Sequence, residues 1–266
     1  MQPLIDGDII RYEIGFAAEA GIRHSSGDLD ALPSWDYVEA VLDRRMQEIE
    51  EAVGATCAPI VFLTDAPTFR DQVACTKEYK GGRSSTKPWH FANITAYLEC
   101  RYQVEREAGL EADDLMAIRQ TLVEDQVICS RDKDLKQVPG WLYSWELGKQ
   151  PKFGPTLITK AGDLSYDKTK GKISGTGYAW FCAQLLMGDT TDNIPGIKGV
   201  GPAAAYEFLR HCTKPKHYLD NVKDVYRNHA KDNWERYLLE QGQLLWMVRR
   251  YNSDGTPEMW SVDQYE

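Results

Sequence analysis

The sequence lacks the marks of several common classes of protein. Its six cysteines include no C-x-x-C pair and its five histidines include no H-E-x-x-H motif, which argues against a zinc site and a disulfide framework. No apolar run is long enough to span a membrane, and the first residues lack the basic region and apolar block of a secretory signal. We therefore expect a cytoplasmic protein with reduced cysteines and no membrane partner.

A general basic surface is also lacking, because the formal net charge is −9. A protein that coats nucleic acid with positive charge does not have this composition. Basic residues are concentrated instead in one segment, where five of them stand against two acidic residues: Arg70, Lys77, Lys80, Arg83 and Lys87. Any contact with a polyanion is therefore expected to be local.

Short apolar runs alternate with amphipathic segments in the first part of the chain. The runs at 4–5, 59–63 and 126–129 predict buried strands, and 141–145 and 156–159 are further candidates. The spacing of apolar residues over 34–53 and 111–122 predicts helices. This alternation predicts an α/β fold with a mostly parallel central sheet and helices on both faces.

Acidic residues stand at the ends of the predicted strands. Asp6, Asp65 and Asp132 each follow an apolar run, and the carboxyl ends of parallel strands form the functional edge of such a sheet. Two further clusters are Glu111-Ala112-Asp113-Asp114 and Asp132-Lys133-Asp134. Alone, each also fits a turn, the start of a helix or a solvated loop.

A last pair of acids, Asp189 and Asp192, is three residues apart, so on one helical turn both would point the same way. If these clusters meet, each pair of carboxylates at ~4 Å repels by about 4 kcal/mol. Bound cations would relieve the repulsion. Oxygen ligands favour Mg²⁺ or Mn²⁺, and this number of ligands suits two ions about 4 Å apart, as in phosphodiester hydrolysis.

A glycine-rich hairpin, Gly196-Ile197-Lys198-Gly199-Val200-Gly201, follows directly, and Pro202 is suited to the first position of a helix. Backbone N–H groups at such a hairpin can hold a phosphate. A carboxylate metal site beside a phosphate-binding hairpin indicates nucleic acid chemistry.

Four sequence blocks occur in a recognisable order: VFLTDAPTFR with EYKGGR, then LEADDL, then SRDKDL, then GDTTDNIPGIKGVG. Over roughly residues 3–210 the chain resembles the structure-specific 5′-nuclease family. This family includes the 5′-nuclease domains of bacterial DNA polymerase I, flap endonucleases and phage 5′→3′ exonucleases. The short, free-standing format is most similar to a bacteriophage exonuclease, which would act in the host cytoplasm.

The resemblance implies a PIN-like 5′-nuclease fold acting as one unit. It places a nuclease core at 1–175, with a helical arch insertion at about 70–108, and a helical region at 176–266, with a helix–hairpin–helix at about 181–210. Asp8 stands where many relatives have a neutral residue. The metal ligands that the resemblance implies are Asp6, Asp65, Glu111, Asp113, Asp114, Asp132, Asp134, Asp189 and Asp192.

The implied activity is divalent-metal-dependent cleavage at 5′ ends, nicks or flaps of duplex DNA, and also of RNA in RNA–DNA hybrids, in replication or recombination. The resemblance places Lys80 and Arg83 at the reacting phosphate, K⁺ at the hairpin, and replication proteins among the partners. The expected DNA contacts are Arg70, Lys77, Tyr79, Gly196, Lys198, Gly199 and Gly201.

Two other functions stay open on the residues alone. Asp6-Gly7-Asp8 with Gly188-Asp189 and Asp192 imitates the motifs of a dehalogenase-type aspartyl phosphatase, in which Asp6 would be the nucleophile. A DNA-end binding protein without catalysis is the second alternative, although it would not need nine acids where phosphate must lie.

Overall fold

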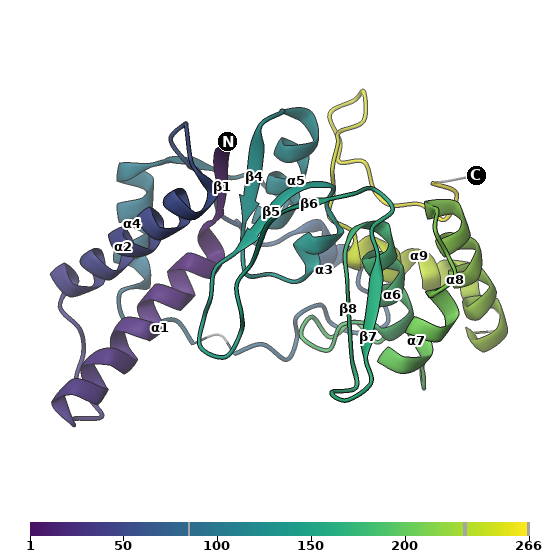
Figure 1. Ribbon diagram of the computed structural model, residues 1–266, viewed down its shortest axis with the longest axis horizontal. Coiled ribbons are helices and arrows are strands. Elements are labelled where there is room, and N and C mark those ends of the chain that lie inside the picture. Colours follow the sequence, from purple (N-terminus) through teal and green to yellow (C-terminus); the bar gives the residue numbers. More distant parts are fainter. Residues whose placement is uncertain (85, 231–232, 265–266) are drawn as a thin grey trace. The chain divides into compact units, whose positions relative to one another are not determined.

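The computed structural model describes residues 1–84, 86–230 and 233–264 (Figure 1). These residues divide into two compact units. Unit 1 contains Met1–Ala66, Ser84–Asp132 and Trp141–Thr156, and unit 2 contains Pro67–Arg83, Lys133–Gly140 and Leu157–Glu266. The expected boundary near residue 175 therefore differs from the observed division. Two internal segments pack with the C-terminal part of the chain.

The main sheet carries the predicted strands of unit 1. In the described chain its order is β3-β2-β1-β4-β5-β6, and β1 runs parallel to both β2 and β4. The pairs β2–β3 and β4–β5 are also parallel, which confirms the predicted α/β class. The strands are β1 (Gln2–Asp6), β2 (Ile60–Phe62), β3 (Gln103–Glu105), β4 (Gln126–Cys129), β5 (Gly140–Ser144) and β6 (Phe153–Ile158).

Helices cover both faces of this sheet. The helices α1 (Gly7–Ser26), α2 (Trp35–Val53) and α4 (Phe91–Arg101) bury their apolar stripes together with one set of strand residues, which includes Ile5 and Val127. Side chains alternate between the faces of a strand, so Leu4 points to the other face, where α5 (Ala112–Leu122) packs on β1, β2 and β4. The predicted helices at 34–53 and 111–122 are thus confirmed.

The helix α1 was not predicted from the sequence. Asp6 is its N-cap, and its carboxylate accepts a hydrogen bond from the Ile9 N–H at 3.0 Å. Aspartate favours this position because it satisfies a backbone donor at the helix start.

The expected arch at 70–108 is divided between the two units, and its role as one insertion stays a prediction. Its first part, with α3 (Phe69–Val73) and the loop to Arg83, belongs to unit 2. Its second part belongs to unit 1, where β3 pairs with β2 and α4 buries Ile94 and Leu98 one helical turn apart. This apolar spacing makes α4 part of a packed layer. Ser85 lies outside the described residues.

Unit 2 is mostly helical, as expected after residue 176. The helices η1 (Asp134–Gln137), α6 (Gly177–Met187), α7 (Pro202–Leu209), α8 (Pro215–Ala230) and α9 (Trp234–Leu245) surround a second core. The segment 160–177 contains an antiparallel hairpin that the sequence did not predict, formed by β7 (Leu164–Asp167) and β8 (Lys172–Gly175). Within the described part of the chain, no helix combines the length and the apolar character needed to cross a bilayer.

Candidate metal and phosphate sites

The carboxyl edge of the unit 1 sheet gathers several of the predicted acids. Asp6 ends β1, Asp65 follows β2 by three residues, and Asp132 follows β4 by three residues. Because β1 lies between β2 and β4 and all three run in the same direction, their acidic ends share one edge. The expectation drawn from the strand ends is therefore confirmed as a matter of topology.

Asp6 is the most deeply placed of these acids. Its carboxylate accepts hydrogen bonds from the Ser130 hydroxyl at 2.5 Å and from the Ile9 N–H. Burial, reinforced by the charge of Asp8 and more weakly by Asp132, raises the pKa of Asp6 to about 7. Asp8 itself pairs with Arg11 and accepts from the Thr64 N–H at 3.3 Å. A cation at this edge would favour the ionised form of Asp6.

The acids at the start of α5 form a capping box. The side chain of Glu111 accepts from the backbone of Asp114, whose carboxylate accepts from the Glu111 N–H at 3.1 Å. The Ala112 N–H donates to the Thr64 hydroxyl at 2.9 Å, which fixes this helix start beside the end of β2. Asp114 is fully buried and Asp113 is half-buried. Two of these acids therefore cap the helix, and the start of a helix is one of the roles that the sequence alone allowed.

Asp65 differs from its neighbours because it is exposed. Its carboxylate accepts from Arg106 at 3.2 Å, and the same guanidinium also pairs with Glu99. The structure therefore places Asp65 at the expected edge, within a surface ion-pair network.

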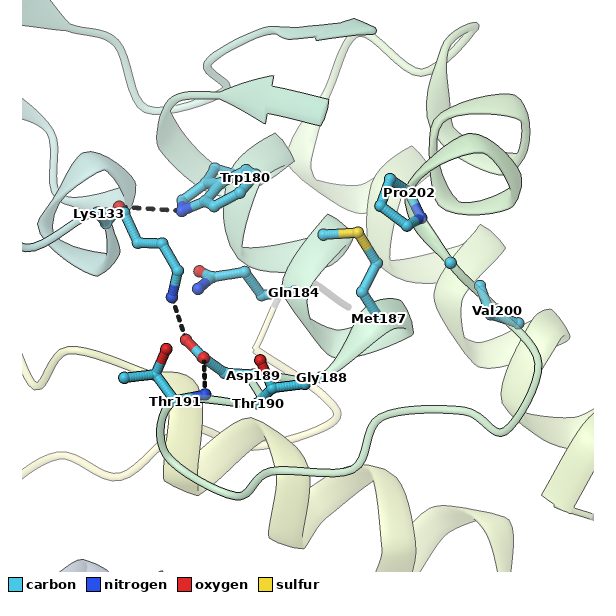
Figure 2. A pocket seen from close by; sticks show the side chains of 11 residues that line it. Lys133, Trp180, Gln184, Met187, Gly188, Asp189, Thr190, Thr191, Val200 and Pro202 are labelled. Carbon is cyan, nitrogen blue, oxygen red and sulfur yellow. Dashed lines mark hydrogen bonds and ion pairs between the residues drawn. The ribbon is translucent and has the colours of Figure 1, made fainter. Parts of the chain in front are cut away.

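In unit 2 a lysine joins two of the predicted acids. The ammonium group of Lys133 donates to Asp134 Oδ1 at 3.2 Å. It also pairs with Asp189 Oδ2 (Figure 2). Gln184 on α6 donates to the same Asp134 oxygen at 2.5 Å. Burial opposes ionisation of Asp189, but the hydrogen bond and charge of Lys133 and the Thr191 N–H outweigh it, so the pKa lies below its usual value.

Asp189 and Asp192 lie in a loop, so the prediction that they share a helical turn is wrong. The backbones of Asp189 and Ile194 exchange two hydrogen bonds of 2.8 Å, and Asn193 adopts a positive φ of 60°. This narrow bridge closes a turn in which a helix cannot form. The two carboxylates consequently have different partners.

Basic and aromatic residues from the segment before residue 84 contact Asp192. Arg83 pairs with its Oδ1, and the Tyr79 hydroxyl donates to Oδ2 at 3.1 Å. The Lys80 N–H donates to the Asp192 carbonyl oxygen at 3.0 Å, while the Lys80 ammonium lies 4.9 Å from the centroid of the Tyr79 ring. The two expected catalytic cations thus lie beside one expected metal ligand.

Three of the expected DNA contacts, Arg70, Tyr79 and Gly196, are buried. Arg70 is completely enclosed, and its guanidinium donates to the carbonyl oxygens of Leu244 and Trp246 at 2.9 and 2.7 Å. Tyr79 is covered and holds Asp192. Gly196 packs against Gly188, where a Cβ atom would lie 2.2 Å from the Gly188 nitrogen.

The other expected DNA contacts are at the surface. Lys77, Lys198, Gly199 and Gly201 are exposed. Gly199 has a φ of 86° in the turn closed by the Val200 N–H and the Ile197 carbonyl oxygen at 3.0 Å, and Gly201 caps α7 with Pro202 as its first residue. The helix–hairpin–helix form is therefore confirmed.

Residues that contact the acids but were not predicted include Ser130, Lys133 and Gln184. Lys133 stands between two acids in SRDKDL, and this position is a signal that the sequence offered. Ser130 and Gln184 gave none, because their roles depend on side chains brought together by the fold. Across 1–84, 86–230 and 233–264, no three His, Cys, Asp or Glu side chains are gathered as a metal site. In unit 2 the carboxylates instead hold cations of the protein.

A pocket of about 260 Å³ opens beside Lys133 and Asp189 in unit 2 (Figure 2). Trp180, Gln184 and Met187 of α6 line it, together with the loop 188–191 and the hairpin end at 200–202. The nearby donor set consists of carboxylate and amide oxygens, which suits Mg²⁺ or Mn²⁺ and disfavours softer metals. A protein ammonium already bound by two of these carboxylates shows that the group accepts a cation. The residues therefore fit a divalent ion.

Comparison with known proteins supports the resemblance. No protein-family model matches the chain. DNA polymerase I of Bacillus subtilis is 27% identical over 245 residues, covering 88% of this chain but only 26% of the polymerase. A 5′-3′ exonuclease of Mycoplasma pneumoniae is 28% identical over 251 residues, covering 91% of this chain and 80% of that protein. The chain thus spans about a quarter of the length of the first of these relatives and most of the second.

Solved structures show the same fold. The bacteriophage T5 flap endonuclease, crystallised with DNA and metal ions, matches with a TM-score of 0.54 at 16% identity, over 92% of this chain and 89% of that one. The T5 5′-exonuclease bound to zinc matches with a TM-score of 0.55 at 15% identity, over 90% and 88%. The predicted 5′-nuclease fold is therefore confirmed.

Proposed function

We propose that this protein is a divalent-metal-dependent 5′-nuclease that hydrolyses phosphodiester bonds at 5′ ends, nicks or flaps of duplex DNA. The observation that carries the proposal is the row of acids at one edge of a parallel sheet whose fold is that of the T5 5′-exonuclease. Its sequence similarity to a 5′-3′ exonuclease over nearly the whole chain supports the same activity.

We propose metal ligands within each unit. In unit 1 they are Asp6, Asp65, Glu111, Asp113, Asp114 and Asp132, of which Asp6 is held in place by Ser130. In unit 2 they are Asp134, Asp189 and Asp192. Bound Mg²⁺ or Mn²⁺, as two ions, would supply an activated water and stabilise the leaving oxygen.

Around these acids the protein's own cations would act on the substrate. Lys80 and Arg83 stabilise charge on the transferring phosphate and orient it, since both lie beside Asp192. The exposed hairpin residues Lys198, Gly199 and Gly201 hold the backbone of the duplex through N–H groups and one positive charge. We also propose K⁺ at this hairpin, RNA–DNA hybrids as substrates and replication proteins as partners, which rest on the resemblance alone.

A nuclease assay tests the proposal directly. Duplex, nicked and flap DNA with a 5′ label should be cut in Mg²⁺, and EDTA should stop the reaction. Asp132→Asn and Asp189→Asn should each abolish cleavage, because each removes a charge that the metals need, while DNA binding is retained. Exposed acids provide matched controls, since Glu124→Gln in unit 1 and Asp220→Asn in unit 2 should cleave normally. Wild-type turnover in Asp132→Asn or Asp189→Asn would remove that residue from the site.

The same preparation separates the two other functions. An aspartyl phosphatase would form a phosphorylated Asp6 with small phosphate esters, detectable by mass spectrometry after trapping. A DNA-end binding protein would retain DNA without cutting it in any metal. Cleavage that EDTA abolishes and Mg²⁺ restores excludes the second of these.

A further inference from the structure

Lys133 reaches from the surface onto two shielded acids in unit 2. The side chains of Asp134 and Asp189 are 8% and 3% exposed, whereas that of Lys133 is 47% exposed. Figure 2 shows its ammonium directed at the Asp189 carboxylate, with the Gln184 amide beside it. One positive charge thus faces two negative charges that are largely withdrawn from water.

The backbone of Lys133 is fixed independently of its side chain. Its carbonyl oxygen accepts a hydrogen bond from the Trp180 indole at 3.0 Å. Beyond this anchor, a flexible four-carbon chain carries a compact charge that hydrates readily. The ammonium can therefore leave the acids for solvent while the main chain stays in place.

The surroundings of the acids leave room for another cation. The adjoining pocket of about 260 Å³ is large enough for an ion that keeps several waters, as Mg²⁺ does. The nitrogen of the Gln184 amide is held by Asp134, and its Oε1 atom is buried without a hydrogen-bond partner among the described residues. This oxygen is an acceptor suited to the waters of such an ion.

We propose that Lys133 is a displaceable internal cation: it neutralises Asp134 and Asp189 in the metal-free protein and gives them up when a divalent cation binds. The inference rests on the proposed function, because the displacing ion is the one that the nuclease needs. A metal and an ammonium cannot both occupy these carboxylates, since like charges repel strongly at contact distance. Lys133 therefore stabilises the metal-free site and lowers its affinity for metal.

Chemical labelling of lysines in the full chain tests the displacement without any activity measurement. Acetylation followed by mass spectrometry should show Lys133 several-fold more reactive in saturating MgCl₂ than in EDTA. Lys170 is the internal control, because it is 73% exposed and pairs with Asp167 on the hairpin, so its labelling should not change. Unchanged labelling of Lys133 at a metal concentration that binds Asp189, as judged by loss of binding in Asp189→Asn, overturns the proposal.

Removal of the charge provides the second measurement. Lys133→Met should bind Mn²⁺ about tenfold more tightly or better by calorimetry, because no ammonium competes, whereas Lys170→Met should match the wild type. Without metal, the melting temperature of Lys133→Met should be lower than that of the wild type. Mn²⁺ should reduce this difference in melting temperature. Equal or weaker Mn²⁺ binding overturns the inference.

The two proposals fail in different ways. If the wild type neither binds Mn²⁺ nor cuts DNA, the proposed nuclease function and the inference fall together. If the wild type binds metal and cuts DNA while the labelling of Lys133 does not increase, only the proposal that Lys133 is displaced is refuted.

Discussion

At the scale of single residues, Arg83 has two competing partners. Its guanidinium pairs with Asp192 and its Nε lies 3.5 Å from the Thr191 carbonyl oxygen, whereas the proposed function requires it at the reacting phosphate. When a residue only attracts DNA, its loss weakens binding, and saturating enzyme restores the single-turnover rate. When a residue contacts the transition state, saturating enzyme does not restore the rate. Lys77, exposed on the same segment, is suited to the attracting role alone.

We therefore expect Arg83→Ala to lower the single-turnover rate by about 10²–10³, the usual cost of losing a charged transition-state contact. Lys80→Ala should be impaired in the same way. Arg83→Lys should remain slow, because an ammonium cannot grip two oxygens as the planar fork does. Single-turnover kinetics at saturating enzyme provide the measurement. Lys77→Ala is the control, and its single-turnover rate should recover fully at saturating enzyme. If the rate of Arg83→Ala also recovers fully, Arg83 only attracts DNA and does not contact the transition state.

The acids themselves could be predicted from sequence, because strand ends and motif spacing fix where carboxylates stand. Their partners could not. Tyr79 and Arg70 belong to a basic, glycine-containing segment that indicates a solvated loop, yet both are buried, since tertiary packing supplies carbonyl and carboxylate acceptors from far along the chain. The pairing of Lys133 with Asp189, fifty-six residues away, is likewise a product of the fold.

At the scale of elements, the hairpin between α6 and α7 uses its glycines for different purposes. Gly188 and Gly196 pack against each other, so neither tolerates a side chain. Gly199 needs a positive φ in an exposed turn, while Gly201 has an ordinary φ of −100° and open space around it. Strand and helix positions were predicted well where apolar periodicity was strong. The β7–β8 hairpin and α1 were missed because polar and glycine residues dominate their sequences or their starts.

Substitution by valine should separate these purposes. Gly199→Val should weaken duplex binding and also destabilise the protein by about 1–2 kcal/mol, because a β-branched residue resists the left-handed region. Gly201→Val should weaken binding with little loss of stability. Fluorescence anisotropy with duplex DNA and urea unfolding measure the two effects.

Gly27 provides the matched control, because it ends α1 with a φ of 72° and has nothing within 4 Å of a Cβ position. Gly27→Val should lose stability but bind DNA normally. If both hairpin variants cut long duplexes as the wild type does at limiting enzyme, the hairpin is not the DNA anchor.

At the scale of the whole molecule, the chain passes between the two units at several points. Unit 2 draws on 67–83 and 133–140 as well as on the C-terminal part, and one crossing, after Asp132, falls inside SRDKDL. Hydrogen bonds join both segments to the C-terminal part of unit 2. In 67–83, Arg70 donates to the carbonyl oxygens of Leu244 and Trp246. In 133–140, Gln137 donates to the Leu245 carbonyl oxygen at 2.8 Å. Neither unit is a contiguous piece of sequence.

A fragment of residues 1–162 should consequently fail to unfold cooperatively, although it contains every strand of the main sheet. It would leave Arg70, Gln137 and the apolar residues beside them without partners, and unpaired buried polar groups cost about 1–3 kcal/mol each. Urea unfolding followed by circular dichroism checks this. Coexpression with 163–266 should restore a cooperative transition, and a stable isolated fragment would contradict the expectation.

Because each unit is built from separate segments of the chain, the division also affects which recombination events can give a folded protein. A recombination breakpoint almost anywhere between residues 67 and 157 would join segments of one unit from two parents, so a chimera would have to match two cores at once. Exchange between lineages is then expected to move the chain whole. The similarity that covers 88% of this chain lies within about a quarter of the length of a polymerase, as expected if evolution has moved this region only as an undivided module.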